Sequence, residues 1–227
     1  MRQDAGPSHE FQTVPAMTPT SSRSGPRGTP RASKQRAGTR ILVMAVSQRL
    51  DSVNRKLARL AEETARGMWV DATLVDTADY PLPMCDCDPG TQKEAPPNAV
   101  RLNRMLKEHQ GMIIVTPERN RSVPAVLKNA LEWVAASVLN PDAAYPFKNK
   151  PVMLMSAGEA GTDSFHCMSH LRDILGDMKM HVLPETLTLS DAGKAFGRAG
   201  KIKDAALPER VATMVEELIV LTERLRA

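Results

Sequence analysis

Residues 111–133 constrain the fold of this chain more than any other segment. Residues 112–115 form a short continuous apolar run, which is typical of a central parallel strand covered on both faces. The strand cannot continue, because Pro117 lacks the N–H that a β-ladder needs and polar residues follow it. Ser122 is suited to a helix N-cap, and apolar residues then recur at helical spacing. The segment therefore predicts a buried strand, a polar loop and a helix.

The same alternation of strand and helix recurs along the chain. Five strand–helix units predict one doubly wound α/β domain with a parallel five-stranded sheet. In open sheets of this kind ligands bind outside the carboxyl ends of the strands, so the loops after the strands are the candidate binding residues. The expected strands are residues 41–46, 69–75, 112–115, 151–156 and 181–189.

The charge of the chain is unevenly distributed. Residues 1–40 carry seven Lys and Arg against two Asp and Glu, a net charge of +5, so the remainder carries −1. Residues 1–39 lack hydrophobic periodicity, which predicts a disordered basic tail before a domain at 40–227. A transit peptide and a non-specific anion-binding segment are alternatives for this tail. We expect no nucleic-acid partner, because the basic charge lies outside the domain, and no membrane span, because no apolar run approaches ~20 residues.

The cysteine and histidine residues give no metal-binding pattern. The chain has three cysteines, and this odd, low count argues against a disulfide framework and suits a reducing compartment. Cys85 and Cys87 have no second pair at ligand spacing, so they are interpreted as incidental loop thiols. His166 and His170 share one face of an expected helix but lack a third ligand. We therefore predict no metal site and a cytoplasmic protein.

The loop after the first expected strand carries groups suited to a phosphate. Ser47, Arg49, Ser52 and Asn54 offer two hydroxyls, a guanidinium and an amide beside the start of a helix. The free N–H groups and the dipole of a helix N-terminus favour an anion. We expect this loop to bind a phosphate group, and the alternative is a capped helix with a surface arginine.

Residues 116–133 read T-P-E-R-N-R-S-V-P-A-V-L-K-N-A-L-E-W. This motif resembles the flavin loop of the NADPH-dependent FMN reductases, P-E-Y-N-x-S-[IV]-P-G-x-L-K-N-A-[IL]-[DE]-W. That family comprises flavodoxin-like quinone, azo-dye and chromate reductases. The loop around Ser47 resembles the family's phosphate loop, G-S-x-R-x-x-S-x-N. Two positions depart from the pattern, since the family's Gly is Val46 here and its Tyr is Arg119.

The resemblance covers residues 40–226 and implies a flavodoxin-like fold with strand order 2-1-3-4-5. It implies that FMN lies outside strands one, three and four. The first loop would bind the phosphate, the second would line the isoalloxazine, and the backbone of the third would approach the ring. The implied cofactor-binding residues are Ser47, Arg49, Ser52, Asn54, Pro117, Glu118, Arg119, Asn120, Ser122, Ala157 and Gly158.

The resemblance also implies an enzyme that passes electrons from NADPH or NADH through FMN to a quinone, azo, metal-oxyanion or flavin acceptor. No catalytic side chain is expected, because the flavin itself carries the hydride. Residues 80–83, Tyr-Pro-Leu-Pro, resemble a family segment beside the substrate pocket, and a rigid connection is the alternative. Apolar surface at 125–138, including Trp133, suggests a homodimer or homotetramer. The alternative function is a binding or regulatory module that has lost tight FMN binding.

Overall fold

Five parallel strands form the centre of the structure. The computed structural model describes residues 38–47, 51–86, 94–140, 145–158, 163–197 and 200–226. The strand order is β2-β1-β3-β4-β5, and every neighbouring pair is parallel, as the resemblance implied. The strands are β1 (Arg40–Ala45), β2 (Asp71–Asp76), β3 (Gly111–Val115), β4 (Pro151–Ala157) and β5 (His181–Leu189).

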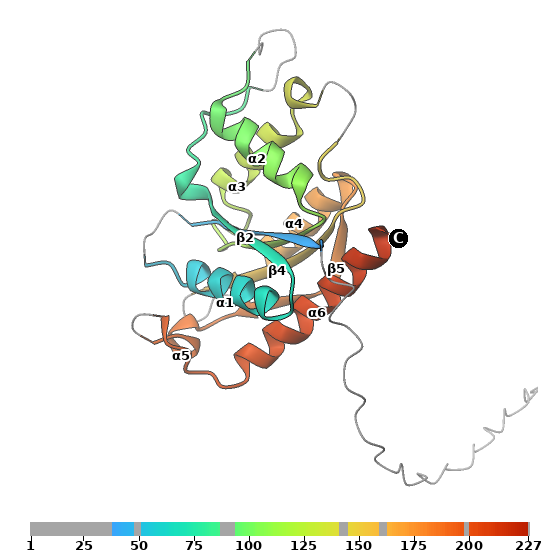
Figure 1. Ribbon diagram of the computed structural model, residues 1–227. Helices are drawn as coiled ribbons and strands as arrows, with labels where there is room; N and C mark the ends of the chain where they lie inside the picture. The colour runs from blue at the N-terminus through green and yellow to red at the C-terminus, as the bar shows by residue number, and fades with distance from the viewer. Residues whose placement is uncertain are drawn as a thin grey trace, which may run out of the picture. The chain divides into compact units, whose positions relative to one another are not determined.

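Helices cover both faces of this sheet. Figure 1 shows α1, α5 and α6 on one side and α2, α3 and α4 on the other. No helix within the described residues is long and apolar enough to cross a membrane. The helices are α1 (Val53–Gly67), α2 (Pro97–Glu108), α3 (Ala125–Ala135), α4 (Phe165–Asp177), α5 (Ala192–Ala195) and α6 (Leu207–Arg226), with 3-10 turns η1 (Thr77–Asp79) and η2 (Ser137–Leu139).

The strands read as continuous apolar runs because both of their faces are buried. Successive side chains of a strand point to opposite faces. In β1, Ile41 and Val43 therefore pack in the core on the α1 and α6 side, whereas Leu42 and Met44 pack in the core on the α2, α3 and α4 side. All five residues of β3 are buried as well. This double burial explains why the sequence lacked the alternation that a half-exposed strand would show.

Gly111, at the start of β3, marks a close approach between β1, β3 and α6. A Cβ at this position would lie 2.6 Å from Ile41 Cδ1 and 2.6 Å from Thr222 Oγ1. Thr222 is buried and donates its hydroxyl to Leu218 O in α6. A larger residue at 111 would therefore push α6 away from the sheet.

Three local expectations from the sequence are wrong. Trp69 does not belong to the second strand, because it lies in the left-handed region (φ 64°) just after the end of α1 and is 77% exposed. Ser122 does not cap α3, whose N-cap is Pro124. The sequence also suggests Asn98 as an N-cap, yet Asn98 lies inside α2, whose N-cap is Pro96, and donates its side-chain amide to Pro81 O. In each case the strand or helix begins one to three residues away from the residue whose side chain best suited that boundary.

The predicted tail lies almost entirely outside the described residues, which begin at Gly38. Thr39 already belongs to the fold, since it is 1% exposed and its carbonyl accepts a hydrogen bond from Asp71 N. The Arg226 guanidinium at the end of α6 donates to Gly38 O at 2.9 Å and to Thr39 Oγ1 at 3.1 Å. Gly38 and Thr39 therefore belong to the fold together with residue 40 and those that follow.

Candidate functional site

A cavity of about 450 Å³ lies at the carboxyl edge of the sheet, where β1, β3 and β4 end. Small-molecule and cofactor sites usually measure about 300–1,000 Å³. Residues of all three predicted loops line this cavity together, although they are far apart in the chain. The predicted residues that line it are Ser47, Ser52, Asn54, Pro117, Glu118, Arg119, Ala157 and Gly158. Arg49 lies outside the described residues.

The first loop presents a helix N-terminus to the cavity. Ser52 is the N-cap of α1, and its hydroxyl accepts a hydrogen bond from Asn54 N at 3.2 Å. The first turn of α1 contains no acidic residue, although Asp51 lines the cavity just before the N-cap, and Lys56 lines the cavity as well. The partial positive charge of the helix N-terminus and the Lys56 ammonium both favour an anion at this end of the cavity.

Asn54 connects the first loop with the third. Its side-chain Nδ2 donates to Ala157 O, and its Oδ1 accepts from Ala157 N, both at 2.8 Å. Asn54 is only 3% exposed. The amide thus makes bidentate contact with the backbone at the end of β4, and neither of its polar atoms is left without a partner. This arrangement gives Asn54 a structural role that the sequence motif did not reveal.

The second loop contains a tight turn. Arg119 and Ser122 exchange both of their backbone hydrogen bonds, at 2.9 Å each, and the two residues between them adopt left-handed conformations, with φ 50° for Asn120 and 59° for Arg121. This geometry is that of a type I′ turn, which asparagine tolerates better than most residues. Asn120 and Ser122 are not among the described residues that line the cavity. Arg119, which replaces the family's Tyr, does line it.

The second loop is also attached to the start of α4. The Glu118 carboxylate accepts a hydrogen bond from Cys167 N at 2.9 Å. Ser122 Oγ and His170 Nδ1 are 3.0 Å apart, and Arg121 contacts His166. Both histidines therefore contact the second loop. No group of three or more potential metal ligands occurs in the described part of the chain.

Glu118 adds a second carboxylate to the α4 N-terminus, where Asp163 Oδ1 already accepts a hydrogen bond from Phe165 N at 3.2 Å. Within the described residues, the N-cap Ser164 makes no capping hydrogen bond, and the first turn contains no acid. Ser164 is in the left-handed region and instead accepts a hydrogen bond from Ser156 Oγ at 2.7 Å. A carboxylate at a helix N-terminus is stabilising because it meets free N–H groups and the positive end of the dipole. Glu118 thereby fixes the loop against α4.

The thiol of Cys167 is not a nucleophile. It is a free, fully buried cysteine, and burial, with a smaller effect of the Glu118 carboxylate, raises its pKa to about 12. The thiol therefore stays protonated at neutral pH. The expectation of incidental loop thiols is wrong for Cys85, which is disulfide-bonded. A low cysteine count excludes a framework of several bonds but not a single one.

The third loop offers fewer donors than its sequence suggested. Ala157 N is bound to Asn54, and Gly158 N donates to Leu189 O at 2.8 Å. These two residues therefore contribute a wall to the cavity rather than N–H groups. The remainder of the loop, residues 159–162, lies outside the described residues.

Residues after β5 complete the cavity, and the sequence did not identify them. The cavity is also lined by Ala192, Gly193 and Phe196, from α5 and its end. Phe196 is 5% exposed and packs in the core with α1 and α6. The sequence contains no motif for this segment, because its residues line the cavity only through the position at which β5 ends.

Hydrogen bonds to Pro83 bear on two expectations, one for the Tyr-Pro-Leu-Pro segment and one for Trp133 in α3. Its carbonyl accepts from Asn129 Nδ2 at 2.9 Å and from Trp133 Nε1 at 2.8 Å. The Tyr-Pro-Leu-Pro segment is thus braced against α3, as expected of a rigid connection. Trp133 is only 1% exposed. The suggestion that Trp133 offers surface to another subunit is wrong, because its own chain already covers the ring.

The chemistry of the cavity fits FMN. The α1 N-terminus and Lys56 suit the phosphate at one end. Pro117, Ala157 and Phe196 give apolar walls suited to an aromatic ring system. Exposed Arg119 offers a planar guanidinium that stacks readily on such a ring.

The sheet order and the position of the cavity define a flavodoxin-like protein. The chain belongs to the NADPH-dependent FMN reductase family, whose model matches residues 39–194. It is accordingly an NAD(P)H-dependent oxidoreductase, and FMN is its cofactor.

Known proteins agree with this membership. The chain is 28% identical over 183 residues to the NADPH-dependent FMN reductase ArsH of Acidithiobacillus ferrooxidans, covering 81% of this chain and 73% of the relative. It is 32% identical over 135 residues to a quinone reductase of Escherichia coli, covering 60% and 68%. The flavoenzyme FerB of Paracoccus denitrificans has a similar fold, with a TM-score of 0.68, 24% identity and coverage of 82% and 98%.

Proposed function

We propose that this chain transfers electrons from NADPH or NADH, through FMN bound in the 450 Å³ cavity, to a small acceptor. The candidate acceptors are a quinone, an azo compound, a metal oxyanion or a free flavin. The observation that carries the proposal is that the loops after β1, β3 and β4 line one cavity. Relatives named quinone reductase and FMN reductase support acceptors of these classes.

The proposed residues divide into two groups by their contacts. The residues that would contact the cofactor are Ser47, Arg49, Ser52, Pro117, Arg119, Ala157 and Gly158. Asn54, Glu118, Asn120 and Ser122 would hold the loops in place, which is supported by the Asn54–Ala157 and Glu118–Cys167 hydrogen bonds and by the type I′ turn.

The bound FMN supplies hydride acceptance and electron transfer, so no side chain needs to act as acid, base or nucleophile. The α1 N-terminus and Lys56 would bind the phosphate and thereby fix the position of the cofactor. Apolar walls such as Pro117 and Phe196 would exclude water from the ring. Arg119 would place positive charge beside the ring, where the family has a neutral tyrosine.

We further propose a cytoplasmic homodimer or homotetramer with no nucleic-acid or membrane partner, and a tail at 1–39 that precedes the domain at 40–227. Met84 and Phe165 are 77% and 64% exposed, and exposed apolar side chains of this size are common at subunit interfaces. Light scattering of the full chain and of a chain beginning at residue 38 would measure subunit number and any effect of the tail.

The experiment that tests the proposal begins with the absorption spectrum of the purified full chain, with and without added FMN. We expect bound FMN, which NADPH or NADH reduces under anaerobic conditions and a quinone, azo dye, chromate or free flavin reoxidises. Comparing the two donors and the acceptors selects among the candidates. Protein that is colourless and takes up no added FMN would contradict the proposal and support a binding or regulatory module.

A further inference from the structure

A second cavity adjoins the first at the start of α1. It measures about 480 Å³ and lies between α1 and the segment that follows α5. Four residues line both cavities, namely Asp51, Ser52, Lys56 and Phe196. The two cavities therefore meet at the α1 N-terminus, which is the end of the first cavity suited to a phosphate.

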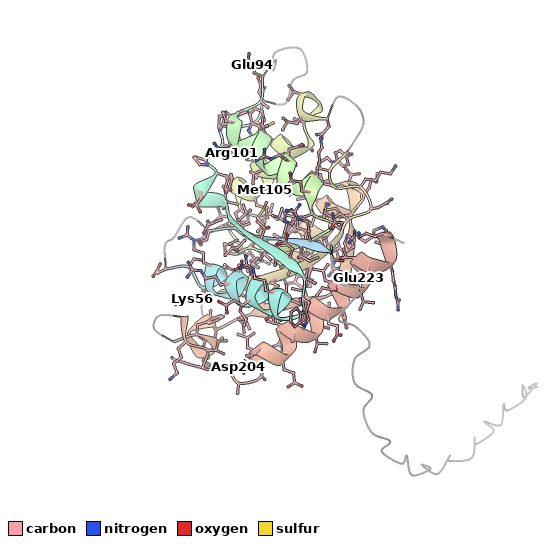
Figure 2. All side chains as sticks on the ribbon, in the orientation of Figure 1. Lys56, Glu94, Arg101, Met105, Asp204 and Glu223 are labelled. Atoms are coloured by element: carbon pink, nitrogen blue, oxygen red, sulfur yellow. The ribbon has the colours of Figure 1, made fainter. Side chains whose placement is uncertain are left out.

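The wall of the second cavity combines cationic, acidic and apolar groups, including the Asp51 carboxylate and Arg55, whose guanidinium is paired with Asp76. Lys56 and Arg59 lie one turn apart on α1, and Figure 2 shows Lys56 on this helix. Glu63 adds a carboxylate one further turn along, and Leu60 adds an apolar side chain. Cations suit a phosphate, a carboxylate suits ribose hydroxyls, and an apolar wall suits a base. Together they match a nucleotide.

The opposite wall is held by a local pairing of backbone segments. Phe196 and Ile202 form an antiparallel bridge, and both side chains line the cavity. Gly197 N donates to Lys201 O at 2.6 Å, and Lys203 N donates to Ala195 O at 2.8 Å. These bonds fix an aromatic ring and a branched aliphatic side chain side by side opposite α1. The apolar part of the cavity is therefore preformed.

We propose that the second cavity binds the adenosine-phosphate half of FAD, so that this chain accepts FAD as well as FMN. This inference rests on the proposed FMN site in the first cavity. FAD differs from FMN by an adenylate group joined to the flavin phosphate, and the second cavity begins where that phosphate would lie. A nicotinamide dinucleotide fits less well, because its reactive ring must reach the flavin ring, away from the phosphate.

The test compares FMN, FAD and riboflavin on flavin-free full chain by calorimetry. We expect FAD to bind within about ten-fold of FMN, since the adenylate gains contacts of its own. Arg59→Glu reverses a charge on the second cavity and should weaken FAD binding by about ten-fold or more, because a charge-assisted hydrogen bond to the adenylate is lost. The same variant should leave FMN affinity unchanged. Arg104→Glu, an exposed substitution on α2, is the matched control.

Four results would overturn the inference. FAD binding far weaker than FMN binding, or equal weakening of both flavins by Arg59→Glu, would show that the adenylate does not use this cavity. A raised KM for NADPH in Arg59→Glu with unchanged FAD affinity would assign the cavity to the donor instead. Failure of FMN and riboflavin to bind at all would contradict the flavin site itself, and so would be distinguishable from the first two results.

Discussion

Replacing Asn54 by alanine tests whether this residue holds two loops together or binds the cofactor phosphate. In the structure its amide makes two buried hydrogen bonds of 2.8 Å to the Ala157 backbone. The substitution removes both and leaves a buried N–H and C=O without partners. Each unsatisfied buried group costs about 1–3 kcal/mol. We expect the free energy of unfolding to fall by about 2–4 kcal/mol, because water from the adjoining cavity offsets part of the loss.

This loss is large compared with a total stability of about 5–15 kcal/mol for a typical domain. Urea unfolding of flavin-free wild type and Asn54→Ala, followed by circular dichroism, measures it directly. Removing the flavin is essential, because a ligand stabilises the folded state and would mix the two roles. Asn98→Ala is the matched control, since Asn98 makes one exposed hydrogen bond to Pro81 O. The control should lose less than about 1 kcal/mol.

The opposite pattern would refute this reasoning. If Asn54→Ala unfolds like wild type without flavin but binds FMN much more weakly, the amide is a phosphate ligand, as the sequence motif implied. If both stability and affinity fall together, the loop connection explains both, because a displaced first loop also misplaces Ser52 and the α1 N-terminus.

Three further substitutions test stability and one tests the cofactor. Glu118→Gln should lower the free energy of unfolding by about 0.5–1 kcal/mol, because it removes charge from the α4 N-terminus; an unchanged melting temperature would exclude the cap. Lys150→Met removes a buried amine, and burial lowers the pKa of this amine from 10.5 to about 8. Between these values the folded wild type binds fewer protons than the unfolded chain, so its stability should rise with pH by up to about 3 kcal/mol relative to the variant, and parallel curves would contradict this. Trp69→Gly should gain about 0.5–1 kcal/mol in urea unfolding, because glycine adopts φ 64° without strain, whereas Trp69→Ala should not. Arg119→Tyr should lower the FMN reduction potential, measured by spectroelectrochemistry, because positive charge favours the reduced flavin; an unchanged potential would place Arg119 away from the ring.

The elements that the sequence predicted well are those whose signal is local. The runs at 41–46, 112–115 and 151–156 are apolar on both strand faces, and the matching strands are buried throughout apart from Arg40. Continuous burial needs helices on both sides, so the doubly wound fold followed from these runs. The strand order, in contrast, came from the resemblance of two loops to a family and is confirmed by the structure.

The errors occurred where a residue's preferred role differs from the role that its neighbours allow. Trp69 is a large aromatic residue, a type that favours β-strands, yet it follows the end of α1 in a left-handed conformation. Trp133 suggested a subunit interface, but Pro83, fifty positions away, accepts its N–H within the same chain. The spacing of apolar residues in the sequence predicts neither the conformation of Trp69 nor the burial of Trp133, because each depends on a distant or irregular segment.

The sequence alone determined the class of this protein, since the apolar runs and the two motifs specify strands, loops and a family. The tertiary structure decided which polar groups of those loops remain available to a ligand. Asn54 and Ala157 are 103 positions apart, and Glu118 and Cys167 are 49 apart, yet each pair is joined by buried or partly buried hydrogen bonds. The physical reason is that a buried polar group must find a partner wherever the fold brings one within reach.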